Sequence, residues 1–419
     1  MLDLKLLREN PEIIREALTR RGATVPLDGL FALERQRREL LTTIEQQRHE
    51  LKAASDVFGR QKAKTANVPP AALKQLSEQI KTQEQQLKQC EEQLERELAL
   101  VPNIPHASVP AGAARANQIV RTVGGKPTFR FTPVSHLELG ERLGIIDFPR
   151  ATKLSASHFP LFTGAGAKLE RALINWMLDV HTKEHGYTEV WPPLLVNRAS
   201  MFGTGQLPKF EEDMYRLKDD DLFLIPTAEV PVTNLHRDEI LEETALPLKY
   251  TAYTACFRRE AGSYGKETRG LIRVHQFDKV ELVKFATPQR SYDELESLVK
   301  DAEVILQRLG LQYRVVLLSA GDLGFASAKT YDLEAWAPGL NQFLEVSSCS
   351  NFEAFQARRA AIRYREASTK KVAHVHTLNG SGVALARTVI CLLETYQEAD
   401  GHVRLPDVLR PYLDGQTHL

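Results

Sequence analysis

The stretch "CFRREAGSYGKETRGLIRVHQFDKVEL" (residues 256–282) predicts two β-strands joined by a glycine-containing, charged loop of about ten residues. Before the loop, Arg258 and Glu260 are expected to share one face of the first strand. After it, five residues fall two apart and are expected to share one face of the second strand: Arg273, His275, Phe277, Lys279 and Glu281. Paired strands would thus carry cations, aromatic rings and carboxylates on one surface. Such a mixture is poorly suited to a hydrophobic core and is unusual on a solvent-exposed face.

Two interpretations of this surface remain open from the pattern alone. A nucleotide platform would use arginine forks to bind phosphates and an aromatic ring to stack on a base. A solvent-exposed hairpin would instead carry cross-strand ion pairs. The length of the loop favours the first interpretation, because long connections in compact domains tend to carry function.

Bulk composition predicts a soluble globular protein of two or three domains. The chain has 419 residues, with 43% hydrophobic and 26% charged, and no apolar run approaches the roughly 20 residues needed to cross a bilayer. Lys plus Arg and Asp plus Glu are both 54, so overall charge gives no indication of nucleic acid. The acidic, amphipathic N-terminus is neither a signal nor a transit peptide, and we expect a cytoplasmic protein without membrane or DNA partners. The four scattered cysteines predict reduced thiols.

The N-terminal segment predicts a helical hairpin. A first helix should begin at Pro11 after an Asn10 cap. Apolar residues then recur three and four apart from Leu30 to Phe58 and again from Leu73 to Val101, with "TANVPPAAL" (65–73) as the break. Each arm of such an antiparallel coiled coil would be about 45–50 Å long. Cations gather on its first helix: Arg35, Arg37, Arg38, Arg48, Arg60, Lys62 and Lys64.

The rest of the chain predicts an α+β fold on an antiparallel sheet flanked by helices. Short strand-like runs alternate with helical patterns, without a parallel βαβ rhythm, a dinucleotide fingerprint or a P-loop. We expect three parts: an N-terminal domain over 1–101 with its coiled-coil arm from about 28 to 101, a proline-rich linker over 102–125, and a larger domain over 126–419.

Three further segments could carry chemistry, each with a plainer alternative. In residues 379–412 a Gly/Ser-rich stretch leads into a helix bearing Arg387, which predicts an anion site or only a capped core helix. In residues 342–365, Glu345 and Ser348 could hold Mg²⁺ beside phosphates. They are three apart, so a regular strand would put them on opposite faces, and joint use requires a bulge or the strand's end. Residues 169–197 predict a helix, a stop at Gly186 and a short strand, which could be core or a dimer contact.

The order of these segments resembles motifs 1, 2 and 3 of class II aminoacyl-tRNA synthetases. The fuller resemblance is to seryl-tRNA synthetases of the bacterial type and covers essentially the whole chain. It rests on five stretches: "GTGQLPKF" (203–210), "TAEVP" (227–231), "FRREAGSYGKETRGLIRVHQFDKVE" (257–281), "SSCSNFEAFQARRAAIRYR" (347–365) and "TLNGSG" (377–382). The N-terminal hairpin also resembles that family's tRNA-binding arm.

The resemblance implies roles for individual residues. Arg258 and Arg387 would be catalytic, and Glu345 with Ser348 would hold Mg²⁺. Serine would contact Thr227, Ala228, Glu229, Glu281, Asn379 and Ser381. ATP would contact Arg258, Arg259, Glu260, Arg273, Val274, Phe277, Glu345, Val346, Ser347, Ser348 and Arg387. Ala386 departs from the glycine that many relatives have before the arginine of motif 3, which leaves the pose of Arg387 less well defined.

The activity implied is the ATP-dependent activation of L-serine to seryl-adenylate and transfer of the seryl group to the 3′ end of tRNA(Ser). The resemblance leaves open whether tRNA(Sec) is a second acceptor. It also implies a homodimer, with the cationic arm binding tRNA. Two alternatives are a serine-activating relative that serves a carrier protein and a non-catalytic tRNA-binding paralogue. The intact arm argues against the first, and the presence of Arg258, Glu260, Glu281 and Arg387 argues against the second.

Overall fold

The computed structural model describes residues 1–61, 70–261 and 269–419. They form two compact units, one of residues 1–19 and 23–102 and the other of residues 20–22 and 103–419. None of the helices within these described ranges is long and apolar enough to cross a membrane.

The first unit is helical. Its helices are α1 (Leu4–Glu9), α2 (Pro11–Arg21), α3 (Leu27–Gln61) and α4 (Pro70–Leu98). The start of α2 at Pro11 confirms the expected boundary, because proline fits the first helical position, where no N–H is needed. The last two residues of α2, Arg20 and Arg21, group with the second unit.

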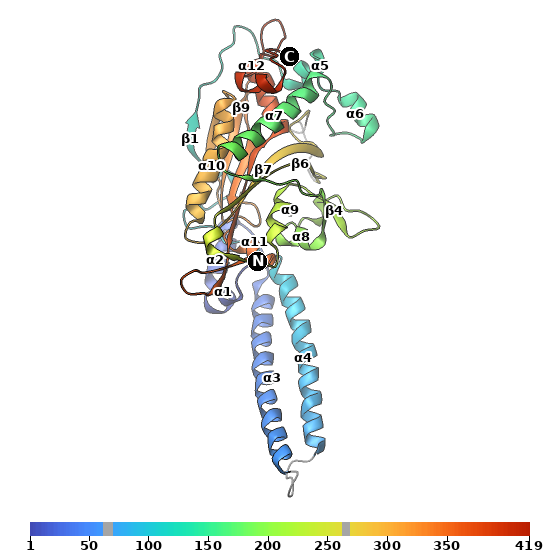
Figure 1. The fold of residues 1–419 in the computed structure, drawn as a ribbon, viewed down its shortest axis with the longest axis vertical. Coiled ribbons are helices and arrows are strands. Elements are labelled where there is room, and N and C mark those ends of the chain that lie inside the picture. Colours follow the sequence, from blue (N-terminus) through green and yellow to red (C-terminus); the bar gives the residue numbers. More distant parts are fainter. Residues whose placement is uncertain (62–69, 262–268) are drawn as a thin grey trace. The chain divides into compact units, whose positions relative to one another are not determined.

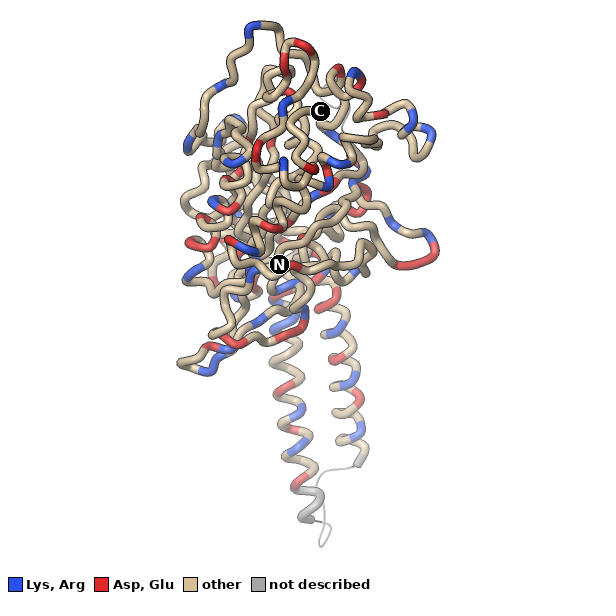
Figure 2. The backbone as a smooth tube through the Cα atoms, turned by 45° about the horizontal axis from the view of Figure 1, so that its top comes forward, with Lys and Arg blue, Asp and Glu red and all other residues tan. Residues whose placement is uncertain are grey.

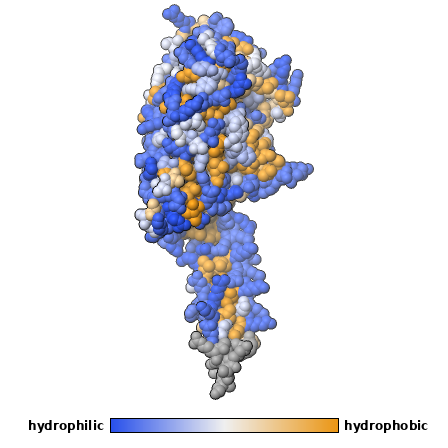
Figure 3. All heavy atoms as spheres, in the orientation of Figure 1, coloured by the Kyte–Doolittle hydropathy of each residue, from blue (hydrophilic) through white to orange (hydrophobic). Residues whose placement is uncertain are grey.

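Helices α3 and α4 pack as the heptad spacing predicted. Leu30 and Leu33 of α3 are buried, as are Cys90 and Leu94 of α4, and the Cys90 thiol lies 3.4 Å from the carbonyl oxygen of Leu33. Apolar residues follow the line where the two helices meet, with hydrophilic residues on the flanks (Figure 3). Two ion pairs also join the helices, between Arg37 and Glu91 at 2.9 Å and between Arg48 and Glu84 at 2.7 Å. Because both pairs are largely exposed, burial of the apolar seam provides most of the stabilisation.

The second unit is built on an eight-stranded sheet with the order β1-β8-β9-β10-β13-β7-β6-β2 (Figure 1). All neighbours are antiparallel except β2 and β6, which confirms the expected fold class. The strands are β1 (Gln118–Val123), β2 (Thr188–Glu189), β6 (Leu248–Phe257), β7 (Gln276–Ala286), β8 (Tyr313–Leu317), β9 (Lys329–Ala337), β10 (Gln342–Asn351) and β13 (His376–Ala384). Two small sheets join β3 (Leu195–Asn197) with β4 (Leu222–Leu224), and β5 (Ile240–Glu242) with β11 (Arg363–Arg365) and β12 (Val372–His374).

One face of the large sheet is covered by helices. Helices α7 (Ala165–Lys183), α10 (Ser291–Arg308) and α12 (Leu385–Tyr396) bury their apolar sides in one core with the even-numbered residues Val280 and Leu282 of β7 (Figure 1). The odd-numbered Phe277, Lys279 and Glu281 therefore point to the opposite face. Shorter helices complete the unit: α5 (His136–Arg142), α6 (Phe148–Leu154), α8 (Arg198–Gly203), α9 (Glu229–Thr233) and α11 (Phe355–Arg359).

Two expectations about local structure were wrong. Strand β6 ends at Phe257 and β7 begins at Gln276, so Arg258, Glu260, Arg273 and His275 lie outside the strands. Glu260 has φ of +51°, which is incompatible with a strand. Residues 262–268 of this connection, including Lys266, lie outside the described residues.

The second correction concerns the glycine-rich stretch before Arg387. Residues 379–382 lie within β13 rather than in a loop at the helix start, and α12 begins only at Leu385. The segment pairs with β7 and β10, so its small side chains allow close packing within the sheet.

Candidate active site

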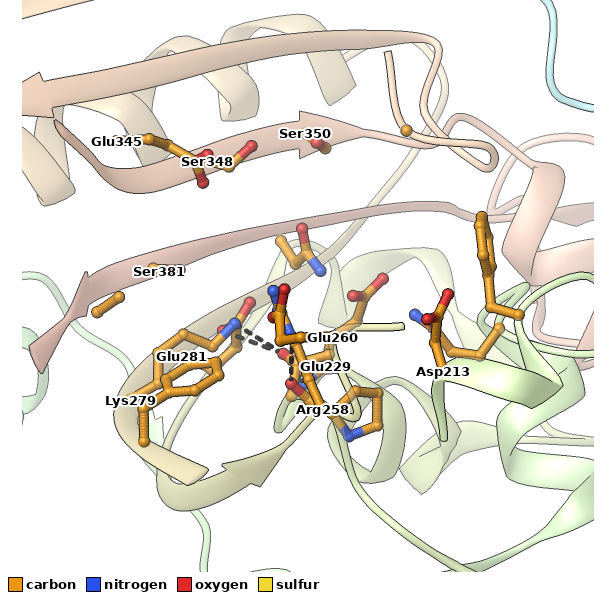
Figure 4. Close-up of a pocket in the computed structure, with 18 of the residues that line it drawn as sticks. Asp213, Glu229, Arg258, Glu260, Lys279, Glu281, Glu345, Ser348, Ser350 and Ser381 are labelled. Carbon is orange, nitrogen blue, oxygen red and sulfur yellow. Dashed lines mark hydrogen bonds and ion pairs between the residues drawn. The ribbon is translucent and has the colours of Figure 1, made fainter. Parts of the chain in front are cut away.

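A cavity of about 630 Å³ lies on the face of the large sheet opposite α7, α10 and α12, beside the part of that face that α9 and α11 cover. Its walls come from the ends of β6 and β7, from β10 and β13, and from loops that follow β4 and precede β9 (Figure 4). It brings together most of the residues that the sequence singled out: Thr227, Glu229, Arg258, Glu260, Arg273, Val274, Phe277, Glu281, Glu345, Val346, Ser348, Asn379, Ser381 and Arg387.

Three expected site residues do not line the cavity. Ala228 is fully buried in the core beneath it. Arg259 turns away and donates through a guanidinium nitrogen to the carbonyl oxygen of Glu212. The hydroxyl of Ser347 donates to the carbonyl oxygen of Ser381 at 2.7 Å, so it joins β10 to β13 behind the cavity wall.

One end of the cavity holds a group of buried polar side chains. Lys279 forms an ion pair with Glu281 and donates to the hydroxyl of Thr227 at 2.8 Å (Figure 4). That hydroxyl lies 3.3 Å from Oε2 of Glu281. Nearby, Glu229 accepts a 2.6 Å hydrogen bond from the side-chain amide of Gln356. When Glu229 is ionised, these two carboxylates and one ammonium leave net negative charge at this end.

Burial sets the protonation of Glu229. Desolvation of the carboxylate, with a smaller contribution from nearby Glu281, raises the pKa of Glu229 to about 7. The hydrogen bond from Gln356 and the ammonium of Lys279 act in the opposite direction. A positively charged ligand would favour the ionised form of Glu229, so this end of the cavity is suited to an ammonium group.

Two β-bulges turn side chains into the cavity. The pairing of β13 with β7 shifts between Ser381 and Val383, and Val383 has φ of +147°. The pairing of β10 with β9 shifts between Glu345 and Ser347. Because a bulge inserts one residue, Glu345 and Ser348 reach the same cavity although they are three apart. From the sequence, Glu345 and Ser348 require a bulge or a strand end to act together, and the structure has a bulge at this position.

The other end of the cavity is rich in arginine. The guanidinium carbon of Arg258 lies 5.1 Å from the ring centre of Phe277, and Nε of Arg258 donates to the carbonyl oxygen of Pro226. Arg273 pairs with Glu260 at 3.0 Å. Guanidinium groups of this kind can bind the phosphate chain of a ligand, and an aromatic ring beside them can stack on its base.

Arg387 lies in the first turn of α12, close to the β10 bulge. It donates to the carbonyl oxygens of Ile272 and Glu345 and lies 3.4 Å from the Glu345 carboxylate. The described residues contain no group of three or more His, Cys, Asp or Glu side chains that could hold a metal by themselves. Glu345 and Ser348 can therefore offer a cation two oxygen ligands, with the remainder coming from a bound ligand or water.

Sequence reasoning missed two polar contributors to the carboxylate end. Lys279 was noted on the strand face without a role, yet it is only 6% exposed and bridges Thr227 and Glu281. A charged residue at an odd-numbered strand position beside Glu281 was the available signal. Gln356 lies in α11, far along the chain from Glu229, and no local pattern in the sequence indicates that contact.

The cationic residues of the arm form a separate group on α3, where they are interspersed with carboxylates (Figure 2). Arg35, Arg38 and Arg48 are exposed, whereas Arg37 is half-buried against Glu91. Arg38 also pairs with Glu34 of its own helix. The side chain of Arg60, and both Lys62 and Lys64, lie outside the described residues.

Comparison with protein-family models gives two matches. Residues 1–105 match the seryl-tRNA synthetase N-terminal domain. Residues 209–396 match the tRNA synthetase class II core domain for G, H, P, S and T. Together the two matched ranges include the helical hairpin and all the residues that line the cavity except Thr204, Gly205 and Gln206.

Similar proteins extend over the full chain. It is 56% identical over 422 residues to the serine–tRNA ligase of Pelotomaculum thermopropionicum, with all of both chains covered. It is 52% identical over 419 residues to that of Desulforapulum autotrophicum, covering 99% of this chain and 98% of the relative. Among solved structures, the seryl-tRNA synthetase of Pyrococcus horikoshii complexed with ATP matches with a TM-score of 0.93 at 37% identity, covering 100% of this chain and 99% of the other.

Proposed function

The chain belongs to the seryl-tRNA synthetase family of class II, and from this premise we propose how its residues carry out the family's reaction. The enzyme joins L-serine to ATP as seryl-adenylate and then transfers the seryl group to the 3′ end of tRNA(Ser). The observation that carries the assignment is the full-length similarity to serine–tRNA ligases, joined to a cavity with an ammonium-binding end and an arginine-rich end.

Serine binds at the carboxylate end of the cavity. Its ammonium group lies between Glu229 and Glu281, whose combined charge exceeds that of Lys279. Thr227 and Asn379 add hydrogen-bonding groups, and Ser381 on the β13 bulge faces the substrate hydroxyl. A pocket whose polar groups pair with that hydroxyl rejects alanine, because alanine leaves them unpaired, an effect of up to roughly 10⁴–10⁵-fold in related cases. Threonine is rejected by the space that its extra methyl group requires.

ATP binds at the arginine-rich end. Phe277 stacks on adenine, Glu260 and Arg273 with Val274 contact the nucleotide, and Arg387 meets the γ-phosphate. Arg258 stands between the two ends, since its neighbours are Phe277 on one side and Pro226, next to Thr227, on the other. It therefore reaches both the serine carboxylate and the α-phosphate.

The chemical step needs no nucleophile from the protein. A serine carboxylate oxygen attacks the α-phosphorus in line, the bond to the bridging oxygen breaks, and pyrophosphate leaves with its electrons. Negative charge accumulates on the α-phosphate oxygens, where Arg258 stabilises it. Holding both reactants in one cavity lowers the activation free energy further, by up to roughly 7–11 kcal/mol in favourable cases. A hydroxyl at the tRNA 3′ end then attacks the activated carbonyl, and AMP leaves.

Mg²⁺ fits beside the β10 bulge. Glu345 and Ser348 provide the carboxylate and hydroxyl oxygens that this ion prefers, and both face the cavity. When bound, the ion neutralises charge on the phosphates. Because two protein ligands leave most of its octahedral shell open, its binding should depend on ATP.

The helical arm binds tRNA through its phosphates. Arg35, Arg38 and Arg48 are exposed cations along α3, a helix of 35 residues. The ion pairs of Arg38 with Glu34 and of Arg48 with Glu84 are weak enough to exchange for phosphate. Contacts of this kind recognise shape rather than sequence. The domain roles follow: residues 1–101 bind tRNA and 126–419 catalyse, and the segment 102–125, which joins them, also contributes β1 to the large sheet.

The enzyme acts as a homodimer in the cytoplasm. Trp191 follows β2 and is 81% exposed, and the nearby Leu194 and Leu195 are also exposed. An exposed apolar patch of this kind is typical of a protein interface. The four cysteines are all buried free thiols, which suits a reducing compartment.

ATP–pyrophosphate exchange, measured with each of the twenty amino acids in turn, tests the assignment. Serine alone should support exchange, and tRNA charging should follow with tRNA(Ser). Exchange with another amino acid, or none at all, would reject it. Exchange with serine but transfer only to a carrier protein would favour the carrier-protein alternative.

A further inference from the structure

The loop that precedes β9 forms one wall of the cavity and is held by donors from distant parts of the chain. Gly324, Phe325, Ala326 and Ser327 line the cavity. The main-chain carbonyl oxygens of residues 323–328 all accept hydrogen bonds from Arg21, Asn103 or His106. These donors, which we call the clip, come from the end of α2 and from the segment after α4.

Arg21 supplies the cationic part of the clip. Its guanidinium donates to the carbonyl oxygens of Leu323 at 3.2 Å, Gly324 at 3.3 Å and Ser327 at 2.5 Å, and to that of Asn103 at 2.7 Å. The side chain is 9% exposed, and burial lowers the pKa of Arg21 to about 10, which leaves it protonated at neutral pH. A buried guanidinium with three of its four hydrogen bonds on one loop fixes that loop's shape.

Asn103 and His106 complete the clip. The main-chain N–H of Asn103 donates to Phe325 at 2.9 Å, and its side-chain amide donates to Ala326 and to Phe352, each at 2.9 Å. The main-chain N–H of His106 donates to Ala328 at 2.9 Å. Buried loop carbonyls need such partners, and here they come from residues more than 200 positions earlier in the chain.

The loop of residues 323–328, which we call the wall, is packed against a second loop that contacts the serine end of the cavity. A Cβ built on Gly205 would lie 3.3 Å from the Cβ of Ala326, so the two loops are packed closely. The carbonyl oxygen of the adjacent Thr204 accepts from the side-chain amide of Gln356 at 3.2 Å. The same Gln356 nitrogen donates to Glu229.

The wall contacts the ATP end only indirectly, through the far end of β10, where the hydroxyl of Ser327 donates to that of Ser350 at 3.3 Å. Within the described residues, Arg273, Phe277 and Arg387 have no hydrogen bond or ring contact with residues 323–328. A displacement of the wall would therefore reach Glu229 through Gly205 and Gln356, whereas β10 is held in place by its pairing with β9 and β13.

We infer that Arg21 and Asn103 are positioning residues for serine binding: through the wall of residues 323–328 they hold the serine end of the cavity in its binding shape. The inference rests on the proposed assignment of the two ends of the cavity. Arg21, at the end of α2, would then contribute to amino-acid specificity, although it lies far from the serine-binding residues in the sequence.

The test uses the full chain carrying Arg21→Lys, which keeps the charge but loses the planar fork, and separately Asn103→Ala. Arg365→Lys is the control, because the guanidinium of Arg365 also donates to a main-chain carbonyl oxygen, that of Lys370, which belongs neither to the clip nor to the wall. The KM for serine and the KM for ATP are measured separately by pyrophosphate exchange, and thermal unfolding reports folding.

Arg21→Lys and Asn103→Ala should raise the KM for serine by roughly ten- to a hundredfold, as a small misplacement in a site does. The KM for ATP should stay within about twofold, and Arg365→Lys should change neither KM. An unchanged KM for serine in folded variants, an equal rise in both KM values, or failure of both variants to fold would overturn the inference. Serine-dependent exchange by the parent protein tests the proposed function independently of these ratios.

Discussion

The side-chain amide of Gln356 donates a 2.6 Å hydrogen bond to Oε1 of Glu229, joining α11 to the first residue of α9 at the carboxylate end of the cavity, where we propose that serine binds. Both groups are buried, and the same nitrogen also binds the carbonyl oxygen of Thr204. Gln356 thereby sets the orientation of a carboxylate whose pKa burial raises to about 7. Serine binding should consequently be sensitive to pH in the physiological range.

The first prediction is a pH-dependent KM for serine. A carboxylate with a raised pKa is protonated below that pKa, and only its ionised form attracts an ammonium group. The KM for serine should therefore fall as pH rises from 6 to 8, by up to about tenfold per pH unit below 7. Glu229→Gln should give a high KM with little pH dependence. A flat profile for the parent enzyme, measured by pyrophosphate exchange, would contradict the assigned role of Glu229.

Arg258 provides the second prediction. Arg258→Ala should lower kcat for serine-dependent pyrophosphate exchange by about 10²–10³-fold, because charge on the α-phosphate loses its nearest stabilising group. Arg216→Ala is a suitable control, since Arg216 is half-exposed and pairs with Asp221 and Glu211 outside the cavity. Near-normal exchange by the Arg258 variant would exclude its catalytic role.

The third prediction concerns magnesium. Glu345→Gln and Ser348→Ala should each raise the Mg²⁺ concentration needed for half-maximal exchange by roughly ten- to a hundredfold, the usual range for perturbing a metal shell. Binding of Mn²⁺ to the enzyme–ATP complex, followed by electron paramagnetic resonance, gives a readout independent of turnover. Glu296→Gln on α10 serves as the control, because that carboxylate is exposed. If both variants bound Mn²⁺ as the parent enzyme does, Glu345 and Ser348 would not be ligands of the metal.

Periodicity predicted the elements of the fold better than it predicted the site. The spacing of Leu30, Leu33, Cys90 and Leu94 depends only on helix geometry, and the hairpin formed as expected. The alternation of Phe277, Lys279 and Glu281 likewise placed them on one strand face. Such rules act over a few residues, so they hold wherever the local structure is regular.

The remaining site geometry depends on irregular backbone and long-range contacts. Glu345 and Ser348 face one cavity only because β10 has a bulge against β9, and no sequence rule states where a bulge must fall. Arg258 and Glu260 were assigned to a strand that ends one residue earlier, at Phe257. The roles expected for Arg258 and Glu260 came from a family resemblance. The spacing of the residues alone could not distinguish a nucleotide-binding surface from an exposed hairpin with ion pairs.

The fourth prediction concerns self-association. Trp191→Glu should shift the protein from dimer to monomer at micromolar concentration, because a charge placed in an apolar interface is left without a partner. Leu154→Glu is the control: Leu154 is another large apolar residue, 74% exposed, on α6. Sedimentation velocity distinguishes the outcomes. A monomeric parent, or equal dissociation of both variants, would contradict an interface at Trp191.

The fifth prediction separates the two units. A chain lacking residues 42–88, with a short Gly–Ser turn in their place, keeps the Arg37–Glu91 pair and the buried residues Leu33, Cys90 and Leu94. Its serine-dependent pyrophosphate exchange should stay within about twofold of the parent, whereas charging of tRNA(Ser) should fall at least about a hundredfold, because the exposed cation Arg48 is removed with much of the arm. Equal loss of both activities would show that the arm is needed for adenylate formation.

Salt dependence gives a finer test of the arm. Each of Arg35→Gln, Arg38→Gln and Arg48→Gln should reduce the slope of log KM for tRNA against log salt concentration by up to about 0.9, because one fewer counterion is released for each phosphate that the arm no longer neutralises. Exchange activity should not change. Arg142→Gln is the control, since Arg142 is equally exposed but lies on α5 and pairs with Glu138. If the arm variants keep the parent slope, these arginines do not bind phosphate.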